Sequence, residues 1–172
     1  MSAGASTSPG AGVSTRRATV VDAVAMVAIH FAAVHKLGAE SYPPAVLEAW
    51  SPPSGTRRLS SLSDAIASDH EVLLVAEMEG TVVGWGALHP AQGELRAIYV
   101  HPSHARRGMG ALLLRQLEGH ASNMGLKKLQ LNASMNAEPF YKSQGYERVS
   151  IGLHKLNDEL SMTCVTMNKS FA

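Results

Sequence analysis

A strand, a glycine-containing turn and a helix follow one another in residues 94–125, and no other stretch constrains the fold as much. A strand is expected over residues 94–101, which contain three adjacent β-forming side chains, Ile98, Tyr99 and Val100. Pro102 breaks this strand, because proline lacks the amide that a central ladder needs. Apolar side chains then recur at helical spacing over residues 111–124, and Gly125 supplies a C-terminal stop.

The turn between the strand and the helix has the composition of an anion-binding site. Gly108 and Gly110 lack Cβ atoms, so a phosphate can approach the backbone closely. A helix start leaves several N–H groups without intrahelical partners, and the helix dipole adds partial positive charge there. Arg106 and Arg107 add charged, forked donors. The stretch therefore predicts a pyrophosphate cradle at the end of a strand.

Two nucleotide-binding patterns do not fit this turn. The P-loop requires a Lys and a Ser or Thr after its second glycine, whereas Ala111 and Leu112 follow Gly110. The dinucleotide fingerprint requires a third glycine where Leu113 stands, and an acidic residue about twenty positions further on, where lysines occur instead. Coenzyme A is the remaining candidate.

Residues 99–113, YVHPSHARRGMGALL, closely resemble the acyl-CoA-binding motif of the GNAT N-acetyltransferase superfamily. That motif is Gln/Arg-x-x-Gly-x-Gly/Ala after a strand that ends in a Val-x-Pro-like step. Ala105 departs from it, because the family usually has Gln or Arg at this position. Residues 136–146, NAEPFYKSQGY, resemble a second segment of the family, Asn-x-x-Ala/x-Phe-Tyr-x-x-x-Gly-Phe/Tyr. The resemblance covers roughly residues 17–169, and two motifs in the right order are far more specific than one.

The resemblance implies an α/β (α+β) GNAT acyl-CoA N-acyltransferase fold, with a mixed sheet of about six or seven strands and about four flanking helices. A helix is expected over residues 23–37, with its core face formed by Val24, Val27, Ala28, Phe31 and Val34. The strand 126–133 follows a helical crossover, so it should lie parallel to the strand 94–101. The other expected elements are a strand at 17–21, helices at 45–50, 61–68 and 136–144 (the last with Asn136 as a possible N-cap), and hairpins 72–88 and 146–168.

The same resemblance implies that acetyl-CoA is the acyl donor and that no metal is needed. In the family, two neighbouring parallel strands splay apart, and the pantetheine arm lies between them like a further strand. The amide of Val100 is expected to stabilise the oxyanion. The residues implied to bind the cofactor are Ile98, Tyr99, Val100, Arg106, Arg107, Gly108, Met109, Gly110, Ala111, Asn132, Asn136 and Tyr141.

Direct acyl transfer needs a deprotonated amine and a proton for the departing thiolate. By resemblance, Tyr141 is the expected general acid, since a phenol of pKa about 10 can protonate a thiolate whose acid has a pKa of roughly 8.5. Glu94 is the candidate base, because it stands fourteen positions before Gly108 as in some family members. A core tyrosine and a solvated glutamate are the respective alternatives, and Glu40 and His89 are further candidate bases.

The acceptor pocket is implied to lie near the first helices, where Glu40, Tyr42 and Trp50 are the candidate substrate contacts. Tyr42 and Trp50 have the alternative of packing the helices together. The charged pairs Arg57-Arg58 and Lys127-Lys128 are interpreted as solvated surface charges.

Composition narrows the class of protein. The chain has 172 residues, 45% of them hydrophobic, with a formal net charge of +1. We expect a tail over residues 1–15 and one domain over 16–172. The near-neutral charge favours neither nucleic acid nor a membrane surface, no apolar stretch approaches the roughly 20 residues of a bilayer span, and no secretory signal is visible, so a cytoplasmic location is expected. Cys164, the single cysteine, is expected to be a buried structural thiol, and the histidine spacing does not predict a zinc site.

The main hypothesis is an acetyl-CoA-dependent N-acetyltransferase acting on a primary amine of a small molecule or a protein. The alternative is a non-catalytic acyl-CoA-binding sensor or interaction module of the same fold. The acceptor and the oligomeric state stay open at this point, although the last hairpin offers an edge for a possible homodimer.

Overall fold

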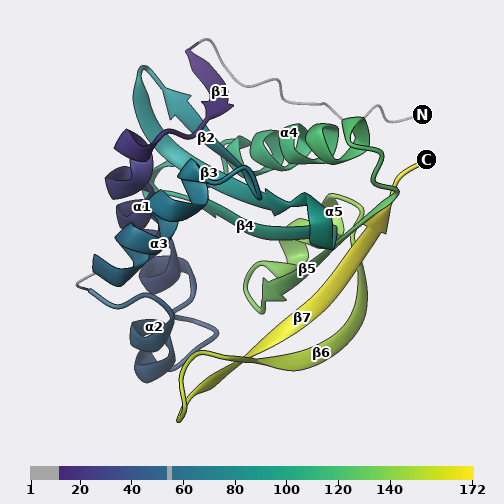
Figure 1. Ribbon diagram of the computed structural model, residues 1–172. Coiled ribbons are helices and arrows are strands. Elements are labelled where there is room, and N and C mark those ends of the chain that lie inside the picture. The colour runs from purple at the N-terminus through teal and green to yellow at the C-terminus, as the bar shows by residue number, and fades with distance from the viewer. Residues whose placement is uncertain (1–11, 54–55) are drawn as a thin grey trace.

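The computed structural model describes residues 12–53 and 56–172, which form a mixed seven-stranded sheet with helices on both faces (Figure 1). The strand order is β1-β2-β3-β4-β5-β7-β6, and only the β4–β5 pair is parallel. The strands are β1 (Val13–Arg17), β2 (Val72–Met78), β3 (Thr81–His89), β4 (Glu94–Val100), β5 (Lys128–Ser134), β6 (Glu147–Lys155) and β7 (Ser161–Ser170). The predicted fold class and the parallel crossover are confirmed.

The helices divide between the two faces of the sheet. One face carries α1 (Ala23–Leu37), α2 (Pro44–Trp50) and α3 (Thr56–Ala67), and the other carries α4 (Met109–Asn123) and α5 (Glu138–Ser143), as Figure 1 shows for α1, α3 and α4. Short 3₁₀ turns occur at Val20–Asp22, Pro90–Gln92 and Pro102–His104.

Both faces of the central strands are buried, which explains why β2 is apolar without alternation. Leu74 of β2 packs in the core beneath α4, whereas Leu73 packs in the core beneath α1 and α3. A buried hydrogen bond joins α1 to the sheet, from Trp85 Nε1 to the Met26 carbonyl oxygen at 2.9 Å. A third cluster, with Val46 and Leu47 of α2, lies beside the second, so the helices that flank the candidate site are held by one core on the α4 side and two on the α1 side.

Several boundaries differ from those expected. The first strand is Val13–Arg17, so it begins inside the expected tail and ends where the strand was predicted to begin, while residues 1–11 lie outside the described part of the chain. The third helix is longer than expected, and α5 begins after Ala137 rather than Asn136. The hairpins, β5 and the turn at Gly125, which has φ of 83°, agree with the predictions.

The predicted core face of α1 is wrong except for Val34, which is buried. Val24 is 66% exposed, and Val27, Ala28 and Phe31 are not buried. The buried side is formed by Ala23, Met26, Ile29, His30, Ala33 and Val34. Because α1 is apolar around most of its circumference, periodicity alone does not identify the face that meets the sheet.

One segment contradicts the prediction that no apolar stretch is long enough to span a membrane. Residues Val20–Leu37 have a mean hydropathy of 1.6 over 18 residues, enough to cross a membrane by length and composition alone. A core helix of a folded domain passes the same test, and α1 packs against β3 and β4. This is weak support for a membrane span, and the cytoplasmic location stays a prediction.

Candidate functional site

The parallel strands β4 and β5 separate almost as soon as they begin. Their one ladder pair is Glu94 with Gln130, where the Gln130 N–H donates to the Gly93 carbonyl oxygen at 2.9 Å. On its other side β4 pairs with β3 along its length, except that Arg96 is a bulge residue without a partner. The bulge bends β4 next to the point where β5 departs, and a gap opens between the two strands.

The pairing of β4 with β3 decides which backbone groups face this gap. The His101 N–H donates to the Val83 carbonyl oxygen at 2.8 Å, which makes these two residues a hydrogen-bonded pair. Hydrogen-bonded and non-hydrogen-bonded pairs alternate along an antiparallel ladder. The backbone groups of Tyr99 therefore point to β3, whereas those of Ile98 and Val100 point into the gap.

The same reasoning applies to β5 on the other side of the gap. The Phe171 N–H donates to the Lys127 carbonyl oxygen at 2.8 Å, so alternate residues of β5 direct their backbone groups away from β7. Gln130 and Asn132 belong to this set. Three of the sequence-predicted residues, Ile98, Val100 and Asn132, thus present backbone groups to one gap, and Tyr99 does not.

Tyr42 has a structural position beside this gap. The last β5–β7 pair is Ser134 with Cys164, so Met135 and Thr163 would form the next one. Instead the Tyr42 hydroxyl donates to the Thr163 carbonyl oxygen at 2.6 Å and accepts from the Met135 N–H at 2.8 Å. Its hydroxyl lies between the two strands where the ladder ends. Tyr42 is not among the residues that line the cavity described below.

The turn before α4 leaves a row of N–H groups without acceptors. The first helical bond runs from the Leu112 N–H to the Gly108 carbonyl oxygen at 2.9 Å. Among the described residues, the N–H groups of residues 106–111 donate to no acceptor. Arg106 and Gly108 have φ of 60° and 83°, so the chain is left-handed here, and Arg106, Arg107 and Gly108 are exposed. This is the geometry of an anion-binding helix start.

The two glycines of the turn have different surroundings. A Cβ on Gly108 would meet no atom within 4 Å, so the space above it is open to a ligand. A Cβ on Gly110 would make ordinary contact with the Phe140 ring of α5, at 3.4 Å. The side chain of Met109 is buried, so a ligand bound at the turn would contact the backbone of this residue. Ala111 lies in the first turn of α4, and Asn136 is exposed just before α5.

Tyr141 of α5 lies in the core beneath α4, with 7% of its surface exposed. Burial raises the pKa of the Tyr141 hydroxyl above its usual value, and the nearby Tyr99 hydroxyl raises it further. Tyr141 therefore holds its proton at neutral pH.

A cavity of about 420 Å³ opens on the α1 side of the gap. Glu94, which belongs to the one β4–β5 ladder pair, and Trp50 of α2 both line it. The other residues that line the cavity are His30, Ala49, Arg58, Leu95, Arg96, Tyr99, Asn132, Ser134, His154, Lys155, Leu156, Met162 and Cys164. Glu40 is exposed outside this cavity, and His89 lies opposite Glu94 in the β3–β4 ladder without lining it.

His30 lines this cavity from the buried face of α1 and was not predicted as a site residue. Its Nδ1 lies 2.7 Å from the Ser51 hydroxyl, and its ring meets the Tyr99 ring edge-on at 4.5 Å between centroids. Burial, with a smaller effect of the nearby Arg58 charge, lowers the pKa of His30 to about 3. The imidazole is therefore neutral at physiological pH.

Arg58 also lines the cavity, which corrects its interpretation as a solvated surface charge. It is half-buried, and burial lowers the pKa of its guanidinium. No sequence pattern identifies His30 or Arg58 as a site residue, because each lies in a helix that is remote in sequence from β4. Cys164 agrees with expectation: it is buried and unpaired, and burial raises the pKa of its thiol.

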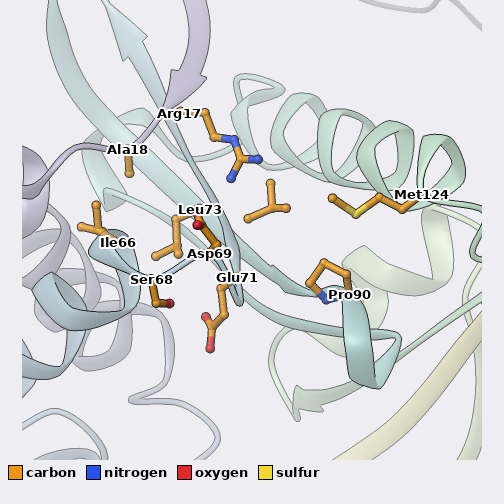
Figure 2. Close-up of a pocket in the computed structure, with 10 residues that line it drawn as sticks. Arg17, Ala18, Ile66, Ser68, Asp69, Glu71, Leu73, Pro90 and Met124 are labelled. Atoms are coloured by element: carbon orange, nitrogen blue, oxygen red, sulfur yellow. The ribbon is translucent and has the colours of Figure 1, made fainter.

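A second, smaller hollow of about 180 Å³ lies away from the gap (Figure 2). Figure 2 shows it between Met124, just past the end of α4, and Ile66 of α3. It therefore lies near the opposite end of α4 from the glycine turn. Within the described residues, no group of three or more His, Cys, Asp or Glu side chains could hold a metal ion.

Comparisons with known proteins agree on one family. The model of the acetyltransferase (GNAT) domain matches residues 39–170. The uncharacterized N-acetyltransferase YjcF of Bacillus subtilis is 33% identical over 88 residues, which are 51% of this chain and 63% of that relative. The chain thus matches less than two thirds of the length of this curated relative.

Solved structures show the same fold. A GCN5-related N-acetyltransferase from Rhodopseudomonas palustris is 28% identical with a TM-score of 0.82, covering 92% of this chain and 95% of that one. The PaiA N-acetyltransferase from Thermoplasma acidophilum, in complex with coenzyme A, is 17% identical with a TM-score of 0.77, covering 92% and 99%. YncA from Salmonella typhimurium, with acetyl-CoA, is 20% identical with a TM-score of 0.67, covering 92% and 94%.

The depressed pKa of His30 predicts acid sensitivity. Below pH 6.5 the unfolded chain binds a proton at this residue that the folded chain does not bind, so stability falls as the pH is lowered. We expect His30 to remove about 1.4 kcal/mol of unfolding free energy per pH unit between pH 6 and pH 4. Urea unfolding at pH 6 and pH 5 measures the change. His30→Gln should lose this dependence and exposed His70→Gln should keep it, whereas equal pH slopes in all three proteins would contradict the assignment.

Proposed function

The chain belongs to the GNAT acetyltransferase family, and we propose that it is an acetyl-CoA-dependent N-acetyltransferase that acetylates a primary amine directly. The observation that carries the proposal is the gap between β4 and β5, flanked by unpaired backbone groups and followed by the glycine turn. The gap adjoins a cavity of about 420 Å³ lined in part by a carboxylate, so donor and acceptor can meet in one place. The proposal covers a primary amine of a small molecule and a primary amine of a protein as acceptors.

The described residues fit acetyl-CoA. The N–H groups of residues 106–111 suit its pyrophosphate, with the open space above Gly108 leaving room for the phosphates. Exposed Arg106 and Arg107 add charge there, and they stand beside Ala105, where the family's usual polar residue is missing. The backbone groups of Ile98, Val100 and Asn132 suit the amides of the pantetheine arm, in the manner of a strand added to an open edge.

Three groups take part in the chemical step of acetyl transfer. Glu94 removes a proton from the ammonium group, directly or through a water, so that the amine nitrogen can attack the thioester carbonyl. The Val100 N–H, which faces the gap, stabilises the oxyanion as the new C–N bond forms. When the C–S bond breaks, the Tyr141 hydroxyl donates its proton to the departing thiolate. The phenol is protonated at neutral pH, so its donor form is present, and its raised pKa makes the proton harder to release.

The non-catalytic alternative shares the gap and the turn but needs neither Glu94 nor Tyr141. An assay of free thiol released from acetyl-CoA, run across a panel of amines, separates the two hypotheses. Release with at least one amine supports the enzyme. Calorimetric binding of CoA without release for any amine favours a sensor or interaction module.

Loss of the Tyr141 hydroxyl is expected to slow turnover. Tyr141→Phe removes the proton donor while the ring still fills its buried site, so kcat should fall about 10²-fold or more with little change in acetyl-CoA binding. Tyr146→Phe is the matched control, because Tyr146 is equally buried but its hydroxyl lies near Glu118 of α4. An unchanged kcat in Tyr141→Phe would remove this residue from the mechanism.

A negative charge in the turn is expected to weaken cofactor binding. Gly108→Asp places a carboxylate in the open space where the phosphates would lie, so the calorimetric Kd for CoA should rise at least tenfold. Gly125→Asp is a close control, since Gly125 also has φ of 83° and open space, but lies at the other end of α4. Equal CoA affinity in the two variants would mean that the phosphates bind elsewhere.

We also propose that the chain forms a homodimer through β6. This strand is an edge of the sheet, and Val149, Ile151 and Leu153 expose 57%, 54% and 75% of their surfaces along it. A second copy of the strand would cover both the apolar side chains and the unpaired backbone groups. The proposal concerns assembly and is independent of the reaction.

Sedimentation equilibrium tests the dimer. Ile151→Glu should raise the dimer dissociation constant at least tenfold, because the charge would be buried in the interface. Val24→Glu places the same charge on α1, where Val24 is 66% exposed, and should leave the assembly unchanged. A wild-type chain that stays monomeric at the highest concentration measured would refute the dimer.

A further inference from the structure

Arg58 is held at the wall of the cavity by its surroundings. It is the third residue of α3, and its Nη2 donates to the Trp50 carbonyl oxygen at 2.8 Å. Its Nε is buried and donates to no acceptor within the described residues. The residue as a whole is half-buried, and it lines the cavity. A fixed orientation with unused donors is what a binding group needs.

Arg58 has no acidic partner within the described residues, whereas Arg96 and Lys155, which also line the cavity, do. Arg96 pairs with Glu71 at 2.8 Å and approaches Glu94 at 3.8 Å. Lys155 pairs with Asp158 at 2.9 Å. Within the described residues Arg58 forms no ion pair with a carboxylate, and residues 1–11 and 54–55 contain no Asp or Glu.

A partly desolvated guanidinium without a countercharge is unfavourable in the folded protein. The lowered pKa of Arg58 reflects that cost. The groups around it do not supply a negative charge, because His30 is neutral and Trp50 and Tyr99 contribute aromatic surface. A guanidinium can bind a carboxylate through two parallel N–H···O hydrogen bonds.

We propose that Arg58 binds a carboxylate of the acceptor, so that the acceptor is a small amino acid-like molecule with both an amine and a carboxylate. The inference rests on the proposed acetyltransferase function and names its substrate class. The cavity is lined by groups of opposite charge, Glu94 for the ammonium group and Arg58 for the carboxylate. Its volume of about 420 Å³ suits a small molecule.

Matched amines test the proposal, because each pair differs only in the carboxylate. The pairs are L-phenylalanine with phenethylamine, L-leucine with isoamylamine, and L-lysine with cadaverine. Two quantities are measured for each: thiol release from acetyl-CoA, and calorimetric binding in the presence of CoA. In the wild-type protein, at least one carboxylate-bearing member should have a kcat/KM or an affinity about 10- to 100-fold above that of its partner.

Variants assign the preference to Arg58. Arg58→Met should abolish the preference, mainly through KM, while CoA affinity stays unchanged, and Arg58→Lys should retain part of it. Arg57→Met is the control, since Arg57 is the exposed neighbour in the same helix and should keep the preference. Thermal melts of the variants establish that they are folded.

The outcomes separate this inference from the proposed function. Acetylation of the plain amines without any Arg58-dependent preference overturns the inference and leaves the acetyltransferase function standing. Arg58-dependent binding of a carboxylate without acetylation supports the inference and overturns the function. Binding of every carboxylate unaffected by Arg58→Met overturns the inference regardless of activity.

Discussion

The separation of β4 from β5 is the constraint on which the rest of this structure depends. A parallel pair inside a sheet would normally satisfy its backbone groups along its whole length, yet these strands share one ladder pair, Glu94 with Gln130. The bulge at Arg96 bends one strand, and the neighbouring strands β3 and β7 hold both in place from outside. The open backbone groups of Ile98, Val100 and Asn132 are the consequence, and a ligand that imitates a strand can satisfy them.

The two faces of the sheet supply different parts of the site. On one face α4 starts at the glycine turn and α5 carries Tyr141, so the groups that suit the acyl donor come from there. On the other face α1, α2 and α3 build the wall of the cavity with His30, Trp50 and Arg58. The Tyr42 hydroxyl, placed between Met135 and Thr163, separates β5 from β7 at the end of their ladder. The packing on the two faces of the sheet thus positions the glycine turn and Tyr141 on one side of the gap and the cavity wall on the other.

The electrostatics of the cavity follow from burial and pairing. Desolvation keeps His30 neutral and Tyr141 protonated, so neither carries charge at neutral pH. The other cations that line the cavity, Arg96 and Lys155, have acidic partners, which leaves the charge of Arg58 facing a site whose acid is Glu94. This distribution is the basis of the proposal that the acceptor carries both an amine and a carboxylate.

The strand–turn–helix unit, the hairpins and the alternation of β5 could be predicted from the sequence; in β5, Leu129 and Leu131 are buried and Gln130 and Asn132 are exposed. These features depend on local periodicity and on glycine stereochemistry, which neighbouring residues carry. Only the tertiary structure decided which face of apolar α1 is buried, that the Tyr42 hydroxyl enters a strand ladder, and that Arg58 joins the cavity instead of the surface. Each of these depends on contacts between segments far apart in the chain, and no local pattern records them.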